Sequence, residues 1–269
     1  MLKTTLKRLA TALPDTIKKP LRTFRDQHRI ARYRGDKYEC PICNAKLKSF
    51  VPYGLKAGAV TEKKVIGCGH RDNVHCPVCW VNDRDRLIYK FVTASPFLAP
   101  PNATILHVAP EYILLKYFKK RSDLNYITAD YIRPTNVRLD ILDLPFADNS
   151  FDLVICNHVL EHVADDGVAM REFHRIMKPN SNAILQVPIA LKLDKTYEDP
   201  SIVDPRAREL AFLQDDHVRL FGRDYPTRLE NAGFEVTIIR WRERPDLFGV
   251  NAEKFGYNPD EAIYMVHKA

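Results

Sequence analysis

Four of the six cysteines stand in two C-P-x-C knuckles, with 32 residues between the second cysteine of one and the first of the other. Two such knuckles present four thiolates from two tight turns, which is the donor set of a tetrahedral zinc site. A disulfide framework is disfavoured without a secretory signal, and a redox C-x-x-C pair needs a thioredoxin-like setting that is absent here. Four thiolates leave no open coordination position, so the pattern predicts a structural Zn²⁺ held by Cys40, Cys43, Cys76 and Cys79.

The segment that carries these cysteines, residues 36–85, is too short to bury a sizeable core of its own. We therefore expect metal binding to supply much of its folding energy. Cys68, His70 and His75 lie between the knuckles and leave an alternative open, in which one of them replaces a cysteine ligand. Cys156 stands alone in an apolar run and is expected to be a buried, small apolar residue.

A second group of chemically active side chains lies in the stretch from His158 to His162, which spells H-x-x-E-H, the pattern of inverted zinc proteases. Two histidines four residues apart on a helix would hold zinc beside a glutamate base. Here the pattern directly follows an apolar strand inside a strand-helix-strand order, which is not the protease setting. We therefore favour another function for this stretch. The plainer alternative is that both histidines only line a cleft.

Short apolar runs that read as buried parallel strands precede these and other polar residues. The runs lie at 104–109, 126–130, 151–156 and 183–188, and a further strand with its loop lies within 138–146. A helix is expected to open at residues 157–162, and another is expected over 168–178. A helix ending at Gly233 and two more strands complete an alternating pattern, which predicts an α/β fold.

The order of these elements resembles the middle of class I S-adenosylmethionine-dependent methyltransferases. The resemblance rests on D-I-L-D-L-P-F at 140–146, F-D-L-V-I-C-N-H-V-L-E-H at 151–162 and K-P-N at 178–180. It is good over residues 104–190 and looser over 210–269. It implies a doubly wound, Rossmann-like sheet, with residues 1–35 as a basic arm, 36–85 as a zinc-ribbon-like module and 86–269 as the methyltransferase domain.

The resemblance also implies where the cofactor, S-adenosylmethionine, binds. The expected cofactor-binding residues are His107, Ala109, Pro110, Glu111, Asp130, Tyr131, Asp140, Ile141, Asn157 and His158. An acid at a strand end, 19 residues after Glu111, is suited to accept both ribose hydroxyls, and Asp130 has that place. The plainer alternative is that Asp130 caps a turn. Asp140 and Ile141 match the adenine-binding position of the family, and Glu111 is expected near the cofactor's amino group.

Charge is distributed unevenly along the chain. Residues 1–35 hold ten Lys/Arg and two Asp, so this arm carries +8 of the net charge of +7 and leaves −1 to the rest. Leucines at spacings of three or four suggest an amphipathic helix that could make weak contact with an acidic membrane surface or RNA, or else a solvated arm. No apolar stretch is long enough to span a bilayer, and we expect the protein to be cytoplasmic.

These observations predict methyl transfer to a small-molecule or sugar-like (glycan) acceptor, and O-methylation is expected. The expected proton acceptor is His217, oriented by Asp216 or His158, with Arg219 placed to hold an anionic acceptor. A surface salt-bridge cluster is the plainer explanation of this stretch. One alternative function is RNA methylation with a zinc-binding recognition module. Another is a degenerate methyltransferase fold that serves as a binding scaffold, because the turn after residue 108 contains no glycine.

Overall fold

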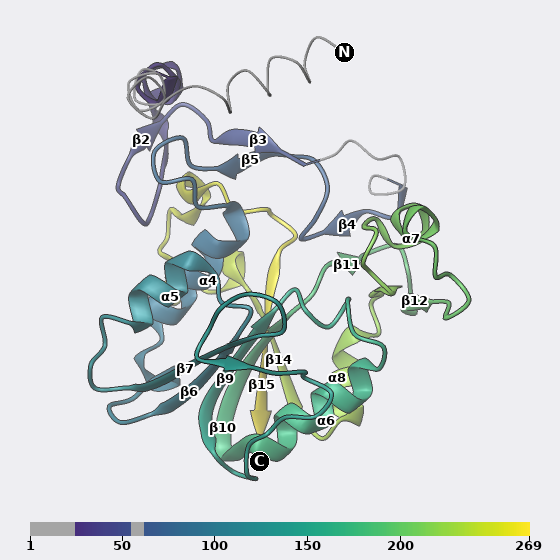
Figure 1. The fold of residues 1–269 in the computed structure, drawn as a ribbon. Coiled ribbons are helices and arrows are strands. Elements are labelled where there is room, and N and C mark those ends of the chain that lie inside the picture. Colours follow the sequence, from purple (N-terminus) through teal and green to yellow (C-terminus); the bar gives the residue numbers. More distant parts are fainter. Residues whose placement is uncertain (1–24, 55–61) are drawn as a thin grey trace, which may run out of the picture.

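A seven-stranded sheet forms the centre of the molecule in the computed structural model, which describes residues 25–54 and 62–269 (Figure 1). Its strands, in sheet order, are β14 (Glu235–Arg240), β15 (Ala262–Lys268), β10 (Met177–Gln186), β9 (Phe151–Asn157), β6 (Thr104–Val108), β7 (Asn125–Asp130) and β8 (Val137–Arg138). Only β15 runs antiparallel to its neighbours. The predicted doubly wound α/β fold is confirmed, with its topological switch point between β6 and β9.

Helices cover both faces of this sheet, which explains why its central strands are apolar on both sides (Figure 1). The helices α4 (Asp83–Ala94), α5 (Tyr112–Phe118) and α9 (Pro245–Phe248) share one core cluster, together with η1 (Pro96–Leu98), η2 (Trp241–Glu243) and η3 (Ala252–Phe255). The helices α6 (Asp166–Ile176) and α8 (Tyr225–Asn231) pack into the other cluster. Asn82 and Asp165 cap α4 and α6 by accepting hydrogen bonds from the third backbone N–H beyond them.

One expected helix is replaced by a turn. Residues 158–164 form turns and bends after β9, and α6 begins only at Asp166. His158 adopts a left-handed φ of 57°, which breaks any continuous helix at the end of the strand. The expectation that residues 157–162 open a helix is therefore wrong. The helix expected over 168–178 is found at 166–176, with its boundaries shifted by two residues.

The cysteine-bearing segment lies over the carboxyl ends of the parallel strands (Figure 1). It contains the antiparallel pairs β1 (Arg34–Glu39) with β2 (Lys46–Leu47) and β3 (Val51–Tyr53) with β5 (Arg71–His75). The remaining strand of the segment, β4 (Val65–Ile66), pairs instead with β11 (Ile189–Ala190) of the main domain. A further hairpin, β12 (Tyr197–Glu198) with β13 (Arg219–Leu220), and helix α7 (Pro205–Phe212) complete the insertion after β10.

The two knuckles have matching backbones. In each, the residue after the second cysteine is left-handed, at Asn44 (φ 58°) and Trp80 (φ 63°), and its N–H donates to the carbonyl of the first cysteine at 2.9 Å. Cys40 Sγ lies 3.6 Å from Cys79 Sγ and Cys43 Sγ lies 3.7 Å from Cys76 Sγ, so the four sulfurs form one cluster.

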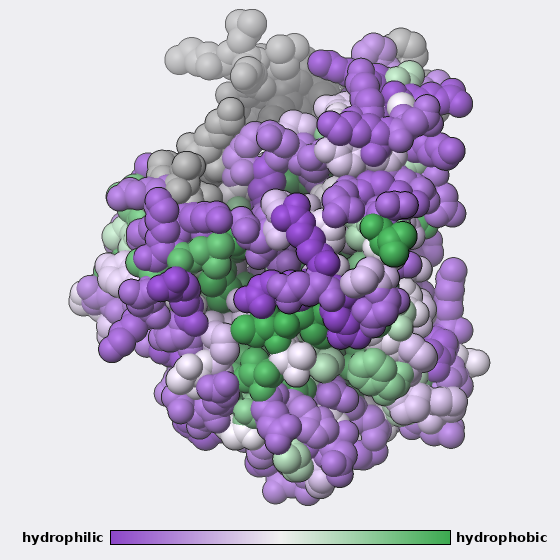
Figure 2. Space-filling model, turned by 180° about the vertical axis from the view of Figure 1, so that it is seen from behind, coloured by the Kyte–Doolittle hydropathy of each residue, from purple (hydrophilic) through white to green (hydrophobic). Residues whose placement is uncertain are grey.

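The basic arm lies largely outside the described residues, so the expected amphipathic helix near its start cannot be compared with the structure; residues 25–33 are helical. Among the described residues, no helix combines the length and the apolar character needed to cross a bilayer. Figure 2 shows that one face of the molecule is mostly hydrophilic, with hydrophobic residues gathered in separate areas near its middle.

The fully buried guanidinium of Arg86 joins the cysteine segment to the main domain. It donates to the carbonyls of Asn73, Val74 and Val81 on one side and to those of Phe255 and Gly256 on the other. Its carbon Cζ lies 3.7 Å from the centre of the Phe50 ring. Gly256 has a φ of 64°, and a Cβ there would lie 2.5 Å from that ring, so glycine is required for this contact.

We expect Arg86→Met to lower the free energy of unfolding by about 3–5 kcal/mol, because five buried carbonyls would lose a charged donor. Urea denaturation, with the zinc content measured on the same samples, checks this. Arg206→Met is the control: its side chain is 70% exposed, so a change within about 0.5 kcal/mol is expected. Equal stability of Arg86→Met and the parent would contradict the assigned role of Arg86.

Candidate active site

A cavity of about 610 Å³ opens at the carboxyl ends of the parallel strands, beside the switch point between β6 and β9. In doubly wound sheets this crevice is where ligands bind. Six of the ten expected cofactor-binding residues line it: Ala109, Asp130, Tyr131, Asp140, Ile141 and His158. Each follows, or lies close after, the end of β6, β7, β8 or β9, as the strand pattern predicts.

The other four expected residues, His107, Pro110, Glu111 and Asn157, do not line the cavity. Glu111 instead accepts hydrogen bonds from His107 Nε2 at 2.7 Å and from Asn157 Nδ2 at 2.8 Å. Although burial opposes ionisation, these two donors hold the pKa of Glu111 below its ordinary value. The Glu111 carboxylate thus ties the end of β6 to the end of β9.

The turn after β6 has the left-handed backbone that glycine would otherwise supply. Ala109 has a φ of 47°, and its N–H donates to Ala129 O at 2.8 Å. An L-residue in this conformation costs roughly 1–2 kcal/mol, which the surrounding strands must offset. Ala109, with its short side chain, lines the cavity even though the turn contains no glycine.

Asp130 is engaged by its own turn. Its Oδ1 accepts from the N–H groups of Ile132 and Arg133, each at 2.8 Å, and its Oδ2 accepts from Arg133 Nε at 2.7 Å. Although partial desolvation opposes the shift, these donors lower the pKa of Asp130. The side chain of Arg133 is 60% exposed, so Oδ2 can be released to a ligand at little cost. Asp140 Oδ1 accepts only from Leu142 N, at 2.9 Å.

His158 lies where the cavity meets the cysteine segment. Its Nδ1 is 3.1 Å from Arg84 Nη1, and that same Nη1 donates to Gly67 O. Burial, followed by the charge of Arg84, holds the pKa of His158 well below its ordinary value. A neutral imidazole therefore lines this end of the cavity, and its Nδ1 is contacted by a guanidinium from the first turn of α4.

Three residues form a polar cluster beside this end of the cavity: Glu161, His162 and His217. Ligand atoms of the three lie within 4.8 Å of one another. The expected pairing of Asp216 with His217 is not formed. Asp216 Oδ2 instead lies 3.2 Å from His162 Nδ1, and His217 Nδ1 lies 3.0 Å from Phe212 O.

Burial changes the proton affinities in this cluster. It raises the pKa of Glu161 to about 8, and burial together with His162 lowers the pKa of His217 to about 4. Both groups are therefore largely uncharged at neutral pH, and His217 keeps a free lone pair but is a weak base. Glu161 and His162 were not among the expected site residues. The H-x-x-E-H spacing was their only sequence signal, and it was interpreted as a helix.

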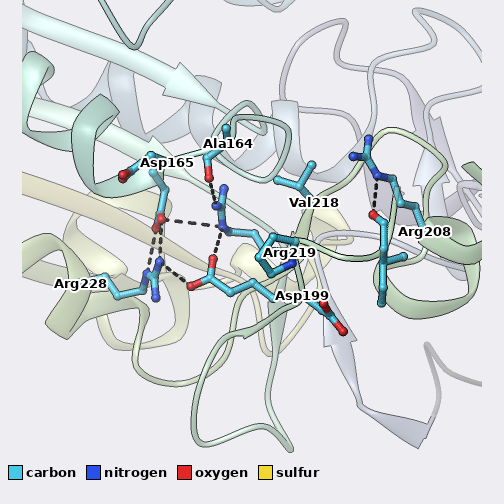
Figure 3. Close-up of a pocket in the computed structure, with 11 residues that line it drawn as sticks. Ala164, Asp165, Asp199, Arg208, Val218, Arg219 and Arg228 are labelled. Atoms are coloured by element: carbon cyan, nitrogen blue, oxygen red, sulfur yellow. Dashed lines mark hydrogen bonds and ion pairs between the residues drawn. The ribbon is translucent and has the colours of Figure 1, made fainter. Parts of the chain in front are cut away.

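The Arg219 side chain does not face an acceptor. It donates to the carbonyls of Leu160, Val163 and Ala164 and to Glu198. In a neighbouring hollow of about 410 Å³, Arg219 and Arg228 converge on carboxylates that lie between them (Figure 3). The two acids are Asp166 and Glu198. Arg219 thus fixes the 160–164 turn against the insertion, and the expectation that it holds an anionic acceptor is not met.

We expect Asp130→Ala to weaken S-adenosylmethionine binding by roughly 2–4 kcal/mol, because two ribose hydroxyls would lose a charged acceptor. Asp140→Ala should cost less, because a single neutral donor loses its partner. Arg133→Ala keeps the Asp130 carboxylate while removing its side-chain partner, so it should bind at least as tightly as the parent. Calorimetric titration measures all three, and parent-like binding by both aspartate variants would refute these assignments.

Comparison with known proteins finds similarity in the central part of the chain. Residues 94–185 match the model of a family described as a methyltransferase domain. A 2-phytyl-1,4-naphtoquinone methyltransferase of Nostoc sp. is 41% identical over 49 residues, which are 18% of this chain and 21% of that protein. A ubiquinone/menaquinone biosynthesis C-methyltransferase of Klebsiella pneumoniae is 31% identical over 105 residues, 34% of this chain and 42% of that one. The chain thus spans well under half the length of these curated relatives.

Among solved structures, a SAM-dependent methyltransferase from Archaeoglobus fulgidus superposes with a TM-score of 0.46 at 15% identity, covering 70% of this chain and 95% of that chain. A complex of the Haloferax volcanii Trm112 methyltransferase activator with a methyltransferase gives a TM-score of 0.43 at 17% identity, covering 70% and 93%. The match over residues 94–185 and the strand order around the switch point identify a methyltransferase domain of the class I, S-adenosylmethionine-dependent type in this part of the chain.

Proposed function

We propose that this protein transfers the methyl group of S-adenosylmethionine to a hydroxyl of a small-molecule or sugar-like acceptor. The observation that carries the proposal is the 610 Å³ cavity at the switch point, which is lined by the carboxylates of Asp130 and Asp140 and by the imidazoles of His158 and His162. S-adenosylmethionine is elongated, with a ribose near one end and a sulfonium near the other, and so matches a cavity with carboxylates and imidazoles in different places. Its adenosine would lie against Asp130, Asp140 and Ile141, and its methyl-bearing end would point toward His158.

The cofactor supplies an electrophilic methyl group on a positively charged sulfur. The protein must align the acceptor hydroxyl with that methyl and remove the hydroxyl proton. A C–O bond forms, the C–S bond breaks with its electron pair going to sulfur, and the proton leaves to a nearby base. The side chains proposed for this step are His217, Asp216 and His158, joined by His162 and Glu161, which lie next to them.

The acceptor side is built from a segment that the family match does not cover. The match ends at residue 185, whereas β11, β13 and the Asp216–His217 stretch follow it. The quinone substrates named for the relatives therefore do not transfer to this chain. RNA methylation remains the second candidate because of the basic arm, but residues 36–269 carry a net charge of only −1, which disfavours a broad RNA-binding face.

The cysteine segment, residues 36–85, is proposed to be a structural zinc module that precedes the domain at 86–269. A tetrahedral site with Zn–S bonds of about 2.3 Å places its sulfurs about 3.8 Å apart. The Sγ–Sγ distances of 3.6 and 3.7 Å fit this geometry. When bound, zinc would supply no chemistry to methyl transfer. It would hold Cys40, Cys43, Cys76 and Cys79 and so stabilise the segment whose Gly67 lies next to His158.

We expect Cys76→Ser to lose most of the tightly bound zinc and to unfold the module, while cofactor affinity stays largely intact. Cys68→Ser is the matched control, because Cys68 lies between the knuckles but outside the sulfur cluster. Metal analysis of freshly purified protein measures both variants. Absence of zinc from the parent protein, or its loss from Cys68→Ser, would contradict the proposed ligand set.

The function itself is tested with labelled S-adenosylmethionine and a panel of hydroxylated small molecules, sugar nucleotides and total RNA. Label in a small molecule supports the proposal, and label in ribonuclease-sensitive material would support the RNA alternative instead. Calorimetry without measurable cofactor binding would favour the scaffold alternative. With the acceptor that takes label, we expect His217→Ala to lose at least about tenfold in turnover while cofactor affinity changes by no more than about twofold.

A further inference from the structure

The cluster of Glu161, His162 and His217 contains buried polar atoms that have no partner. Glu161 Oε2 and His217 Nε2 are both buried, and neither makes a hydrogen bond to any residue that the structure describes. An unpaired buried carboxyl oxygen and an unpaired imidazole nitrogen each cost roughly 1–3 kcal/mol. Two such atoms in one cluster need a ligand that satisfies both.

In each of the two imidazoles, Nδ1 contacts an oxygen atom of another residue, and such a contact fixes the ring orientation in metal-binding histidines. If His217 Nδ1 donates to Phe212 O, at 3.0 Å, the lone pair is left on the unpaired Nε2. If His162 Nδ1 donates to the carboxylate of Asp216, at 3.2 Å, its Nε2 is left for a ligand in the same way. The rings meet edge to face, with their centroids 4.6 Å apart and their planes at 88°.

The turn after β9 is what brings Glu161 and His162 to the same point. Consecutive residues on an α-helix do not face a common point, so a helix here would have separated them. Residues 158–164 form turns and bends instead, and the carbonyls of this stretch are held by Arg219. His217 then approaches from the insertion, supported by the hydrogen bond of Val218 N to Glu161 O at 2.9 Å.

The cationic side chains near the cluster are engaged elsewhere. Arg219 is occupied by three carbonyls and Glu198, and Arg84 Nη1 by Gly67 O and His158. The three clustered residues also make no side-chain hydrogen bonds to one another among the contacts of the described chain. The spacing of up to 4.8 Å between their ligand atoms is that of groups around a shared ion.

We propose that Glu161, His162 and His217 form a second metal site, which binds a divalent first-row transition cation. Two imidazoles and one carboxylate suit Zn²⁺, Fe²⁺ or Co²⁺ and leave coordination positions open. Of the three ligands, His162 also lines the 610 Å³ cavity, so the site lies beside the pocket proposed for the cofactor. The site differs from the cysteine cluster, which has four thiolates and no open position.

The role of this cation rests on the proposed function. A cation in the cluster would attract the acceptor's hydroxyl oxygen and lower the pKa of that hydroxyl. The hydroxyl proton would pass to solvent or to His158, and the oxygen would attack the methyl carbon as the C–S bond breaks. His217 would then act by holding the cation rather than as a base.

Metal binding is tested without an acceptor. Full-length protein that retains its cysteine-bound zinc is dialysed against a mild chelator and then titrated with Co²⁺ in equilibrium dialysis. We expect one further equivalent of Co²⁺, with weak visible bands and without the intense thiolate-to-cobalt absorption. If the protein takes up no further Co²⁺, or if the only new absorption is that of thiolate-bound cobalt, the proposal is overturned. The measurement uses the parent protein, so it does not depend on whether a variant folds.

Glu161→Gln and His217→Gln should each weaken Co²⁺ binding by about tenfold or more, because each removes a ligand. His174→Gln is the matched control, because that histidine packs on Gly233 and Phe234, outside the cluster. Retained cysteine-bound zinc verifies folding of each variant, and parent-like Co²⁺ affinity in both ligand variants would overturn the assignment. Calorimetry with S-adenosylmethionine on the same samples separates the two ideas: lost cofactor binding with Co²⁺ uptake intact would refute the function and leave the site.

Discussion

The buried guanidinium of Arg86 is the interaction on which the arrangement of the whole chain depends. It donates hydrogen bonds to five backbone carbonyls, which belong to the stretches 73–74, 81 and 255–256, and it packs against Phe50. Burial lowers its pKa, while Asp83, Cys40 and Cys76 oppose that change by their negative charge. The Arg86 cation therefore lies close to both the cysteine cluster and the sheet, where it would offset the negative charge of ionised cysteines.

Arg86 also lies close in sequence to a residue that contacts His158. It lies in the first turn of α4, two residues after Arg84, whose guanidinium contacts His158 and Gly67. The β4–β11 pair adds a second attachment between the cysteine segment and the main domain. His158, which lines the cavity, is therefore contacted from the side of the cysteine segment, whereas the residues that line the cavity come from the main domain.

The sequence was sufficient for the sheet and for the strand-end residues, because both follow from local patterns. Apolar runs followed by Asp130, Asp140 or His158 predict a parallel sheet with polar groups at one edge, and the structure has this arrangement. The engagement of Glu111 by His107 and Asn157 depends on contacts across strands, and no spacing encodes it. The Glu161–His162–His217 cluster was hidden for a similar reason. It needs a turn where propensity favoured a helix, and a partner 55 residues further along the chain.

The reach of Arg86 has a consequence for how the chain folds. Its carbonyl partners Phe255 and Gly256 lie 169 and 170 residues further along the chain. Such distant contacts form late, since a long loop must close before they add any stability. The thiolate pairs are close in sequence by comparison and can assemble while the rest of the chain is still being synthesised. During synthesis the Arg86 guanidinium therefore lacks two of its hydrogen-bond acceptors until the last residues have been added. Loss of a short C-terminal stretch would consequently destabilise the cysteine segment near the opposite end of the sequence.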